Sequence, residues 1–439
     1  MKIYSWNLLW FVLFMLKCGV NIPDNSGWAS LNGGTVGGMG GDTIFVDNRS
    51  QLLDAISISG SAIISIRDTI YLLDGEQLEV TASNISIIGS DRNAMIRNGG
   101  LMIIGNNVII QNLSIGDSYI DGHWDGKGEP NTDCLTLYGR NILVDHCELY
   151  KSYDGLVDIV HKGMEPADYI TVSWTKFSNH NKAILVGSND EDTLCRGHLN
   201  LTIHHCWFDG YSKFYDAVDG KYYNLNQRLP RVRFGKVHVF NNYYEGVGAY
   251  CIAARFESDV LVENNYFRNL GNPHIIEDIG LGLKDPELTA SGNIYNNTSG
   301  RHETKGCAFD PLDHYKYSLD PTSIIPALVM NGAGKFNPGN NRSPVASDDT
   351  VYLRNGRKIM ISPLDNDYDP DGDVIRISAV LNQPYGKTVL DPFNIVYTHP
   401  YEMMNYDTIT YQIVDFDGGT DTASIVIYMY GNENREPYR

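Results

Sequence analysis

The sequence predicts an all-β protein in which a right-handed parallel β-helix is followed by a small β-sandwich domain. Segments that alternate apolar and polar residues recur at roughly 25 to 35 residues, which is the spacing of solenoid coils. After about residue 340 the pattern changes to shorter alternating strands separated by turn residues. The chain has 439 residues, enough for one large core and a second, smaller one.

The repeated segments of the first domain each end in a polar pair followed by an apolar or aromatic residue. They begin at Asn107, Asn141, Tyr169, Asn200, Lys236 and Asp259. A strand of this length cannot bury its own apolar face, so stacked coils are the economical way to form a continuous core. We expect this domain to span residues 19–340, with coils from about residue 40 to 330, and to present one sheet as a groove suited to a linear polymer.

Polar residues recur at the turns between these strands. Asn112, Asn241 and Asn264 occupy equivalent turn positions, where stacked amides would form a ladder along the axis. We interpret the histidines of the same segments as ladder or strand residues rather than as metal ligands; these are His146, His205 and His238.

The N-terminal segment is typical of a secretory signal. An apolar run from Leu8 to Leu16 follows an early lysine and is too short to span a membrane. We predict a signal peptide over residues 1–18 and a secreted or cell-surface protein. Cys18 leaves two alternatives open, a plain cleaved signal or a lipoprotein signal with a lipid on Cys18 that anchors the protein to a membrane.

Charge and cysteine usage exclude several classes of partner. The net charge of −19 argues against nucleic acid or an anionic membrane surface, since both attract basic proteins. No feature indicates a protein partner. The cysteines form no CxxC pair, which excludes a compact zinc module. Buried free thiols and one or two disulfides both remain open for the cysteines in strand-like segments, Cys134, Cys147, Cys206 and Cys251.

Three acidic residues stand at the ends of predicted coils. Asp154 and Asp158 in YDGLVDI are separated by an even number of residues, so an extended segment presents both on one face. Asp133 in NTDCLTL is expected one coil below. A hard cation such as Ca²⁺ requires several oxygen ligands of this kind. The alternative is that these are solvated acids on a sheet surface.

Basic residues follow the acids along the predicted groove. Lys182 is expected one coil above the acids, and the three arginines of QRLPRVRFG on the next coil but one. Arg231 and Arg233 share a face, whereas Val232 and Phe234 point to the core. The residues Leu229-Pro230 break this phase and re-aim Arg228. A local cationic site on an acidic protein is one interpretation, and ion pairing with neighbouring acids is the other.

Taken in order, several of these motifs resemble the pectate lyases of polysaccharide lyase family 1. The resemblance covers roughly residues 100 to 270. Its most specific element is the R-x-P-x-x-R segment from Arg228 to Arg233, followed by a strand and NNYY. The other matching motifs are NTDCLTL, VDHCEL, YDGLVDI, YITVSWTKFSNHNKAILVGSND, LTIHHCWFDG and VENNYF.

The resemblance implies a calcium-dependent parallel β-helix enzyme that cleaves polygalacturonate by β-elimination and releases unsaturated oligogalacturonides. It implies that Ca²⁺ is bound by three carboxylates, those of Asp133, Asp154 and Asp158. Lys182 and Arg233 would hold substrate carboxylates, and Arg228 would take the proton from C5 of the uronate. Stabilising the charge that develops on the adjacent carboxylate is what such a weakly acidic proton requires.

An arginine normally keeps its proton up to a pKa above about 12, so a base at Arg228 predicts an alkaline rate optimum. Two features depart from the family pattern. SNHNK before and at Lys182 replaces the usual acid-flanked turn, and the tyrosine-rich insertion at 211–226 predicts a loop over the groove. Its aromatic side chains would either stack on sugar faces or pack the loop down.

Two other functions stay open beside the pectate lyase. One is a lyase for another uronate-containing polysaccharide, such as an algal polymer, because the charged strip matches charge spacing better than sugar identity. The second is a non-catalytic polysaccharide-binding β-helix adhesin. In either enzymatic case the expected partner is an acidic polysaccharide.

The C-terminal segment is expected to be a β-sandwich over residues 345–432. It resembles bacterial Ig-like or cadherin-like modules through LDNDYDPDGD. The alternating acids also match the opening of an EF-hand loop, but Ser378 replaces the final Glu, so a second Ca²⁺ site and a plain Asp-rich turn both remain open. The acids concerned are Asp367, Asp369, Asp371 and Asp373. We expect this module to act as a spacer or in surface attachment.

Overall fold

The structure is a computed structural model of the chain. It describes residues 27–430 except 92, 124–131, 279, 337–341, 355–356, 371–374, 383, 391–393, 401–404 and 416–418. The expected signal peptide, with Cys18, lies outside the described residues, as do Asp371 and Asp373. The chain divides into two compact units, Met1–Pro338 and Gly339–Arg439.

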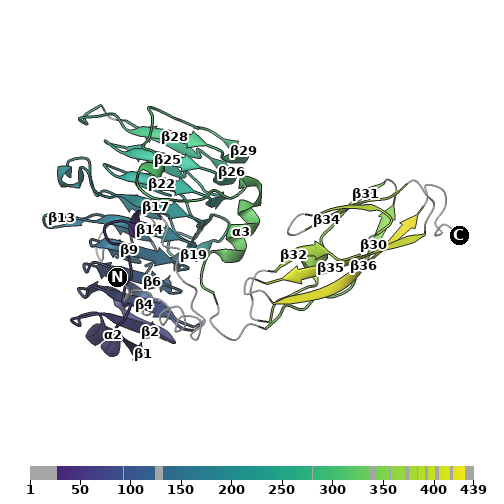
Figure 1. Cartoon of the computed structure of the whole chain (residues 1–439), viewed down its shortest axis with the longest axis horizontal. Coiled ribbons are helices and arrows are strands. Elements are labelled where there is room, and N and C mark those ends of the chain that lie inside the picture. The colour runs from purple at the N-terminus through teal and green to yellow at the C-terminus, as the bar shows by residue number, and fades with distance from the viewer. Residues whose placement is uncertain are drawn as a thin grey trace, which may run out of the picture. The chain divides into compact units, whose positions relative to one another are not determined.

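Unit 1 is a parallel β-helix in which three ladders of strands run the length of the coil stack (Figure 1). The first ladder pairs, in order, β1 (Asp42–Val46), β2 (Ala62–Ile66), β4 (Ile85–Gly89), β6 (Val108–Gln111), β9 (Arg140–Asp145), β14 (Asp168–Ser173), β17 (Leu201–His204), β22 (Lys236–Phe240), β25 (Asp259–Glu263) and β28 (Glu287–Ser291). Each pair is parallel and in register, as the repeat predicts.

The other two ladders meet at β5 (Met95–Ile103). The second ladder continues from β5 through β7 (Ser114–Gly116), β10 (Glu148–Tyr150), β15 (Lys176–Ser178), β18 (Trp207–Asp209), β23 (Tyr243–Glu245), β26 (Tyr266–Gly271) and β29 (Ile294–Ser299). The third contains β3 (Thr69–Val80), β5, β8 (Leu135–Leu137), β11 (Val157–Ile159), β16 (Ile184–Val186), β21 (Arg231–Val232), β24 (Ile252–Arg255) and β27 (His274–Glu277). The third ladder carries the candidate site.

Short elements decorate the coils. The helices are η1 (Trp28–Ser30), α2 (Arg49–Ala55), η2 (Thr193–Cys195), η3 (Pro311–Asp313), η4 (Thr322–Ile324) and α3 (Ile325–Gly332). Two antiparallel hairpins project from turns, β12 (His161–Lys162) with β13 (Glu165–Pro166), and β19 (Phe214–Asp216) with β20 (Lys221–Tyr223). Within the described part of the chain, no helix has both the length and the apolar character needed to cross a membrane.

The interior of the coil stack is filled by side chains that repeat from coil to coil. Phe177, Phe208, Tyr244, Phe267 and Tyr295 form one continuous aromatic stack, with ring centroids 4.5 to 5.4 Å apart. Because equivalent residues lie on top of each other, each coil buries the face that the next one leaves open. Among the described cysteines none forms a disulfide: Cys134, Cys147, Cys195, Cys206 and Cys251 are buried thiols, and Cys307 is exposed.

The asparagine ladder lies one residue later than the turn positions from which we predicted it. Asn241 and Asn264 have left-handed backbones, with φ of 54° and 48°. At such a turn the side chain points away from the core, and both amides instead donate to Asp320, in the segment between η3 and η4. The following residues point inward and form the ladder, in which Asn242 donates to Asn265 and Asn265 to Asn293.

Unit 2 consists of two sheets around one core. The first sheet pairs β30 (Asp349–Arg354), β36 (Thr420–Tyr430), β35 (Tyr406–Val414) and β32 (Arg376–Val380). The second pairs β31 (Lys358–Ile361), β34 (Ile395–Thr398) and β33 (Lys387–Leu390). The short helix η5 (Pro363–Asp365) connects β31 to β32 along the chain. Alternate residues such as Ile409, Ile425 and Ile427 are fully buried, which gives the Ig-like sandwich expected from the alternation.

Candidate functional site

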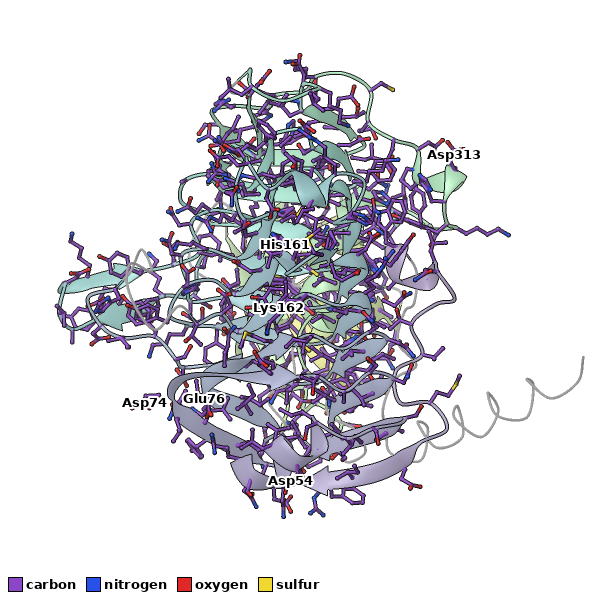
Figure 2. The ribbon with its side chains drawn as sticks, turned by 90° about the vertical axis from the view of Figure 1, so that its left-hand side faces the viewer. Asp54, Asp74, Glu76, His161, Lys162 and Asp313 are labelled. Atoms are coloured by element: carbon purple, nitrogen blue, oxygen red, sulfur yellow. The ribbon has the colours of Figure 1, made fainter. Side chains whose placement is uncertain are left out.

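The third ladder places the predicted acids and cations on four successive strands. Thr136 of β8 pairs with Asp158 of β11, which pairs with Leu185 of β16 and then with Arg231 of β21. The level of β11 can be followed in Figure 2 from His161 and Lys162, which come directly after it, with Glu76 in the coils below. The acids thus lie next to the cations along one sheet.

Asp133 is held firmly in this sheet. Its side chain is 3% exposed and accepts hydrogen bonds from the Gly155 N–H at 2.8 Å and the Thr136 hydroxyl at 2.8 Å. Gln77 of β3 braces Thr136 from the coil below through its side-chain amide. The backbone at Gly155 comes close to two of the acids: a Cβ there would lie 3.0 Å from Asp133 Oδ1 and 3.2 Å from Asp158 Oδ1. Only glycine leaves this space between the carboxylates open.

The carboxylates repel each other. Burial and the charges of Asp158 and Asp154 raise the pKa of Asp133 well above its usual range. Burial and Asp154 also raise the pKa of Asp158, against the opposing attraction of Arg228 and Lys182. A bound cation would offset the repulsion between these carboxylates, so their arrangement favours cation binding.

The ammonium group of Lys182 neutralises part of the negative charge of Asp154. Its Nζ lies 2.5 Å from Asp154 Oδ1, and both side chains are largely buried. Within the described residues no three acidic, histidine or cysteine side chains converge on one point as a closed metal-binding set. The acids are therefore neighbours whose donor chemistry suits Ca²⁺, with the oxygens of Asp133 and Asp158 beside the Gly155 space and Asp154 paired to a lysine.

The three arginines of the R-x-P-x-x-R segment have different surroundings. Arg231 pairs with Glu277 at 2.6 Å, and Arg233 pairs with Asp190 at 2.6 Å, so the ion-pairing interpretation holds for these two. Val232 and Phe234 are buried in the core, which confirms the predicted alternation of faces.

Arg228 is the exception among the three. Its backbone is left-handed, with φ of 62°, a conformation that costs a non-glycine residue about 1–2 kcal/mol. Leu229 after it is fully buried, so the turn fixes the direction of the arginine. The Nε of Arg228 is buried without a partner, and no hydrogen bond or ion pair joins its guanidinium to any other described side chain. Arg228 thus attracts the charge of Asp158 without a direct contact, in a strained conformation of the kind that clusters at functional sites.

Asp190 is a site residue that sequence reasoning missed. It accepts from Arg233 Nε at 2.6 Å and holds Arg255 with two contacts, at 2.9 and 2.6 Å. These hydrogen bonds lower the pKa of Asp190 to about 2. Arg233 also donates from one terminal nitrogen to the carbonyl of Gly187, and its second terminal nitrogen makes no hydrogen bond or ion pair within the described residues. The available signal was the turn GSND directly after the strand that follows Lys182.

His180 is a second residue that the sequence did not single out. It is fully buried, and its Nε2 lies 2.7 Å from the carbonyl oxygen of Asp154. Burial lowers the pKa of His180 to about 4, so the ring is neutral at physiological pH and donates this hydrogen bond. His180 therefore fixes the turn that carries Asp154 without adding a charge.

The tyrosine-rich insertion folds as the β19–β20 hairpin. Phe214 packs against Tyr119 at 4.7 Å, and Asp216 accepts from the Gly122 N–H at 2.8 Å, which ties the hairpin to an earlier turn. Tyr215 and Tyr222 form an exposed cross-strand pair with ring centroids 5.1 Å apart. The packing interpretation therefore holds for Phe214, and stacking of Tyr215 and Tyr222 on sugar faces stays a prediction.

Comparison with known proteins agrees with this geometry. The sequence model of the family described as pectate lyase matches residues 7–335, and that of the bacterial Ig domain matches residues 341–428. A pectate trisaccharide-lyase of Bacillus licheniformis is 32% identical over 329 residues, covering 71% of this chain and 87% of the relative. A probable pectate lyase A of Aspergillus flavus is 36% identical over 322 residues, covering 70% and 87%.

Solved structures show the same relationship. A pectate lyase from Bacillus sp. N165 in complex with trigalacturonate superposes with a TM-score of 0.58 at 28% identity, covering 71% of this chain and 98% of that one. A mutant of the Bacillus subtilis pectate lyase, at 23% identity and a TM-score of 0.57, covers 71% of this chain and 97% of that one and supports the fold. With a family model matched over most of its length, the chain belongs to the pectate lyase family and carries a bacterial Ig domain after it.

Proposed function

We propose that the protein is an exported, calcium-dependent pectate lyase that cleaves polygalacturonate by β-elimination and releases unsaturated oligogalacturonides. The observation that carries the proposal is Arg228, a strained cation without an internal partner among the described residues, set beside Asp158 and Lys182 on a polymer-sized sheet. The trigalacturonate bound to the structural relative supports a polygalacturonate substrate. Export agrees with the N-terminal apolar segment, and a lipid on Cys18 remains the alternative to free secretion.

In the proposed reaction Arg228 accepts the proton from C5 of a uronate residue. The electrons of the broken C5–H bond form the C4–C5 double bond, the C4–O glycosidic bond breaks, and the departing oxygen takes a proton from water. Lys182 and the free nitrogen of Arg233 bind substrate carboxylates and oppose the negative charge that grows during proton removal. Ca²⁺, which Asp133, Asp154 and Asp158 would hold, supplies further positive charge at the uronate carboxylate.

The direct test is ultraviolet absorbance of the unsaturated product on polygalacturonate, with added Ca²⁺ or with chelator. We expect absorbance to rise only when Ca²⁺ is present. If polygalacturonate gives no rise but an algal uronan does, the substrate class is wrong while the chemistry stands. If every uronan leaves absorbance flat while binding persists, the protein is a binding module.

The rate should increase with pH from neutral into the alkaline range. Two effects act in the same direction, since Arg228 must lose a proton and the raised pKa values of Asp133 and Asp158 let protons compete with the metal. The effect of Ca²⁺ on the acid limb separates them: metal–proton competition shifts the limb to lower pH as Ca²⁺ increases, whereas the arginine proton does not respond. A bell-shaped profile centred near pH about 5 would contradict the arginine base.

Asp190→Asn should raise KM for polygalacturonate by about tenfold with little change in kcat. The substitution removes the carboxylate that fixes Arg233 and Arg255, so the Arg233 guanidinium loses its orientation toward a uronate, a charge-assisted contact worth on the order of 1.5–3 kcal/mol. Steady-state kinetics on polymer gives the result. Glu191→Gln is the matched control, because Glu191 lies in the same turn, is exposed and makes no ion pair among the described residues. Equal KM values for the two variants would show that Asp190 has only a structural role.

A further inference from the structure

A cavity lies away from the candidate site of the third ladder, on the side of the turns that precede the first-ladder strands. Its volume is about 670 Å³, within the range of small-ligand sites. The N-terminal segment and the turns of successive coils form its walls, together with His314 at the end of η3, the element marked by Asp313 on the flank of the coil stack in Figure 2. None of the residues assigned to the groove site lines it.

The charges in this cavity are unbalanced toward positive. The carboxylate of Glu257 is already occupied by internal hydrogen bonds. It accepts two from Arg196, at 2.6 and 2.7 Å, and one from the Leu283 N–H at 2.7 Å. Lys236 and Lys284 also line the cavity. Lys236 Nζ lies 5.8 Å from the centroid of the Phe309 ring, and Lys284 attracts Glu257 without forming an ion pair with any described carboxylate. In a chain with 53 acidic and 34 basic residues, two such lysines facing one cavity are a selective arrangement.

The remaining walls suit a ring-shaped, hydroxylated ligand. Trp28 is buried and packs on the exposed His314 with centroids 4.7 Å apart, and the half-buried Tyr169 packs beside Trp28, so the rings of His314 and Tyr169 form one side. Asn32 and Asn200 also line the cavity; their amide nitrogens donate to Asn141 and Asp168, which leaves their amide oxygens as acceptors for hydroxyl groups. Aromatic faces for the C–H faces of sugars, amides for hydroxyls and lysines for carboxylates together describe an acidic saccharide.

We propose that this cavity is a second binding site, for a carboxylate-bearing saccharide of two or three rings. That the ligand is a short oligogalacturonide rests on the proposed function. That it is an acidic saccharide rests on the residues that line the cavity. Such a site would retain released product, or a chain end, on the turn side of the coil stack while the groove acts on the polymer.

The test is isothermal titration of trigalacturonate into the full chain carrying Lys182→Met and Arg228→Lys, in chelator, so that no turnover occurs and binding at the catalytic site is weakened. Adding Lys236→Met and Lys284→Met should weaken binding at least tenfold, because two charge-assisted contacts to the ligand carboxylates are lost. The matched control replaces Lys358 and Lys387 in unit 2 by methionine, which removes the same two charges and should leave the isotherm unchanged. Lys284 is exposed, so Lys284→Met alone provides a fold-neutral variant with an intermediate loss.

Three outcomes would overturn the inference: an isotherm that the cavity variants leave unchanged, equal binding of neutral galactotriose, or equal binding of citrate, which would mark a plain anion site. Activity is measured separately on the chain with Lys182 and Arg228 intact. Cavity variants that still release unsaturated product but no longer bind trigalacturonate in chelator support the second site. Saccharide binding without any product from the unmodified chain would reject the proposed function and leave the cavity site standing.

Discussion

Replacing Arg228 by lysine is expected to lower turnover by at least about a hundredfold while leaving polymer binding in place. Lysine keeps the positive charge but is shorter and lacks the planar guanidinium that the left-handed turn at Arg228 carries. Removing a general base typically costs about 10²–10⁴ in rate, so kcat should fall by that factor. Because Lys182 and Arg233 remain, the KM or a directly measured Kd should change by less than about threefold.

Arg231→Lys is the matched control for this experiment. Arg231 belongs to the same short segment, but its guanidinium is already paired with Glu277. The control should retain most of the activity, since it loses an internal contact and no group that reaches substrate. Similar losses in both variants would mean that the segment acts as a charged surface and that Arg228 is no base. Full activity of Arg228→Lys would contradict the proposed reaction directly.

The predictions from the sequence are confirmed where a regular repeat, either the two-residue alternation of a strand or the length of a coil, determines which way a side chain points. The two-residue alternation predicted that Val232 and Phe234 enter the core while Arg231 and Arg233 leave it, and this is what the β21 region shows. The coil repeat likewise predicted that Asp158 and the arginines lie on one sheet. These features follow from burial, which acts in the same way on every coil.

The carboxylates that pair with the arginines lie in turns, where the sequence shows no regular repeat from which side-chain positions could be predicted. Asp190 binds Arg233 and Arg255 from a loop, and the path of that loop depends on packing against other coils. For the same reason the sequence left both interpretations of the arginines open, although the described part of the structure pairs two of them and leaves Arg228 unpaired. The ladder residues were displaced by one position because the left-handed turn at Asn241 reverses which side chain points inward.

Asp158→Asn should change the stability of the β-helix in opposite directions with and without Ca²⁺. Repulsion and burial raise the pKa of Asp158 in the folded protein above that of an unfolded aspartate, near about 3.9. The folded state therefore binds more protons than the unfolded state, and its stability falls as pH rises through this range. At pH about 8 and in chelator the asparagine variant, freed from this penalty, should melt about 2 °C higher than the unmodified chain.

Added Ca²⁺ should reverse that order. A metal bound by the folded state alone raises the melting temperature, and the variant lacks one of the proposed ligands. The unmodified chain should gain stability with Ca²⁺ and become active, while Asp158→Asn should gain little and stay inactive.

Differential scanning fluorimetry at pH about 8 and about 4 measures both effects. At the lower pH the difference in melting temperature in chelator should shrink, since the carboxyl group is then largely protonated in the folded state. Asp313→Asn, at an exposed acid of η3 that forms no ion pair among the described residues, should show neither shift. If Asp158→Asn lowers the melting temperature in chelator, the carboxylate stabilises the metal-free fold, and the repulsion that makes these acids a cation site is absent.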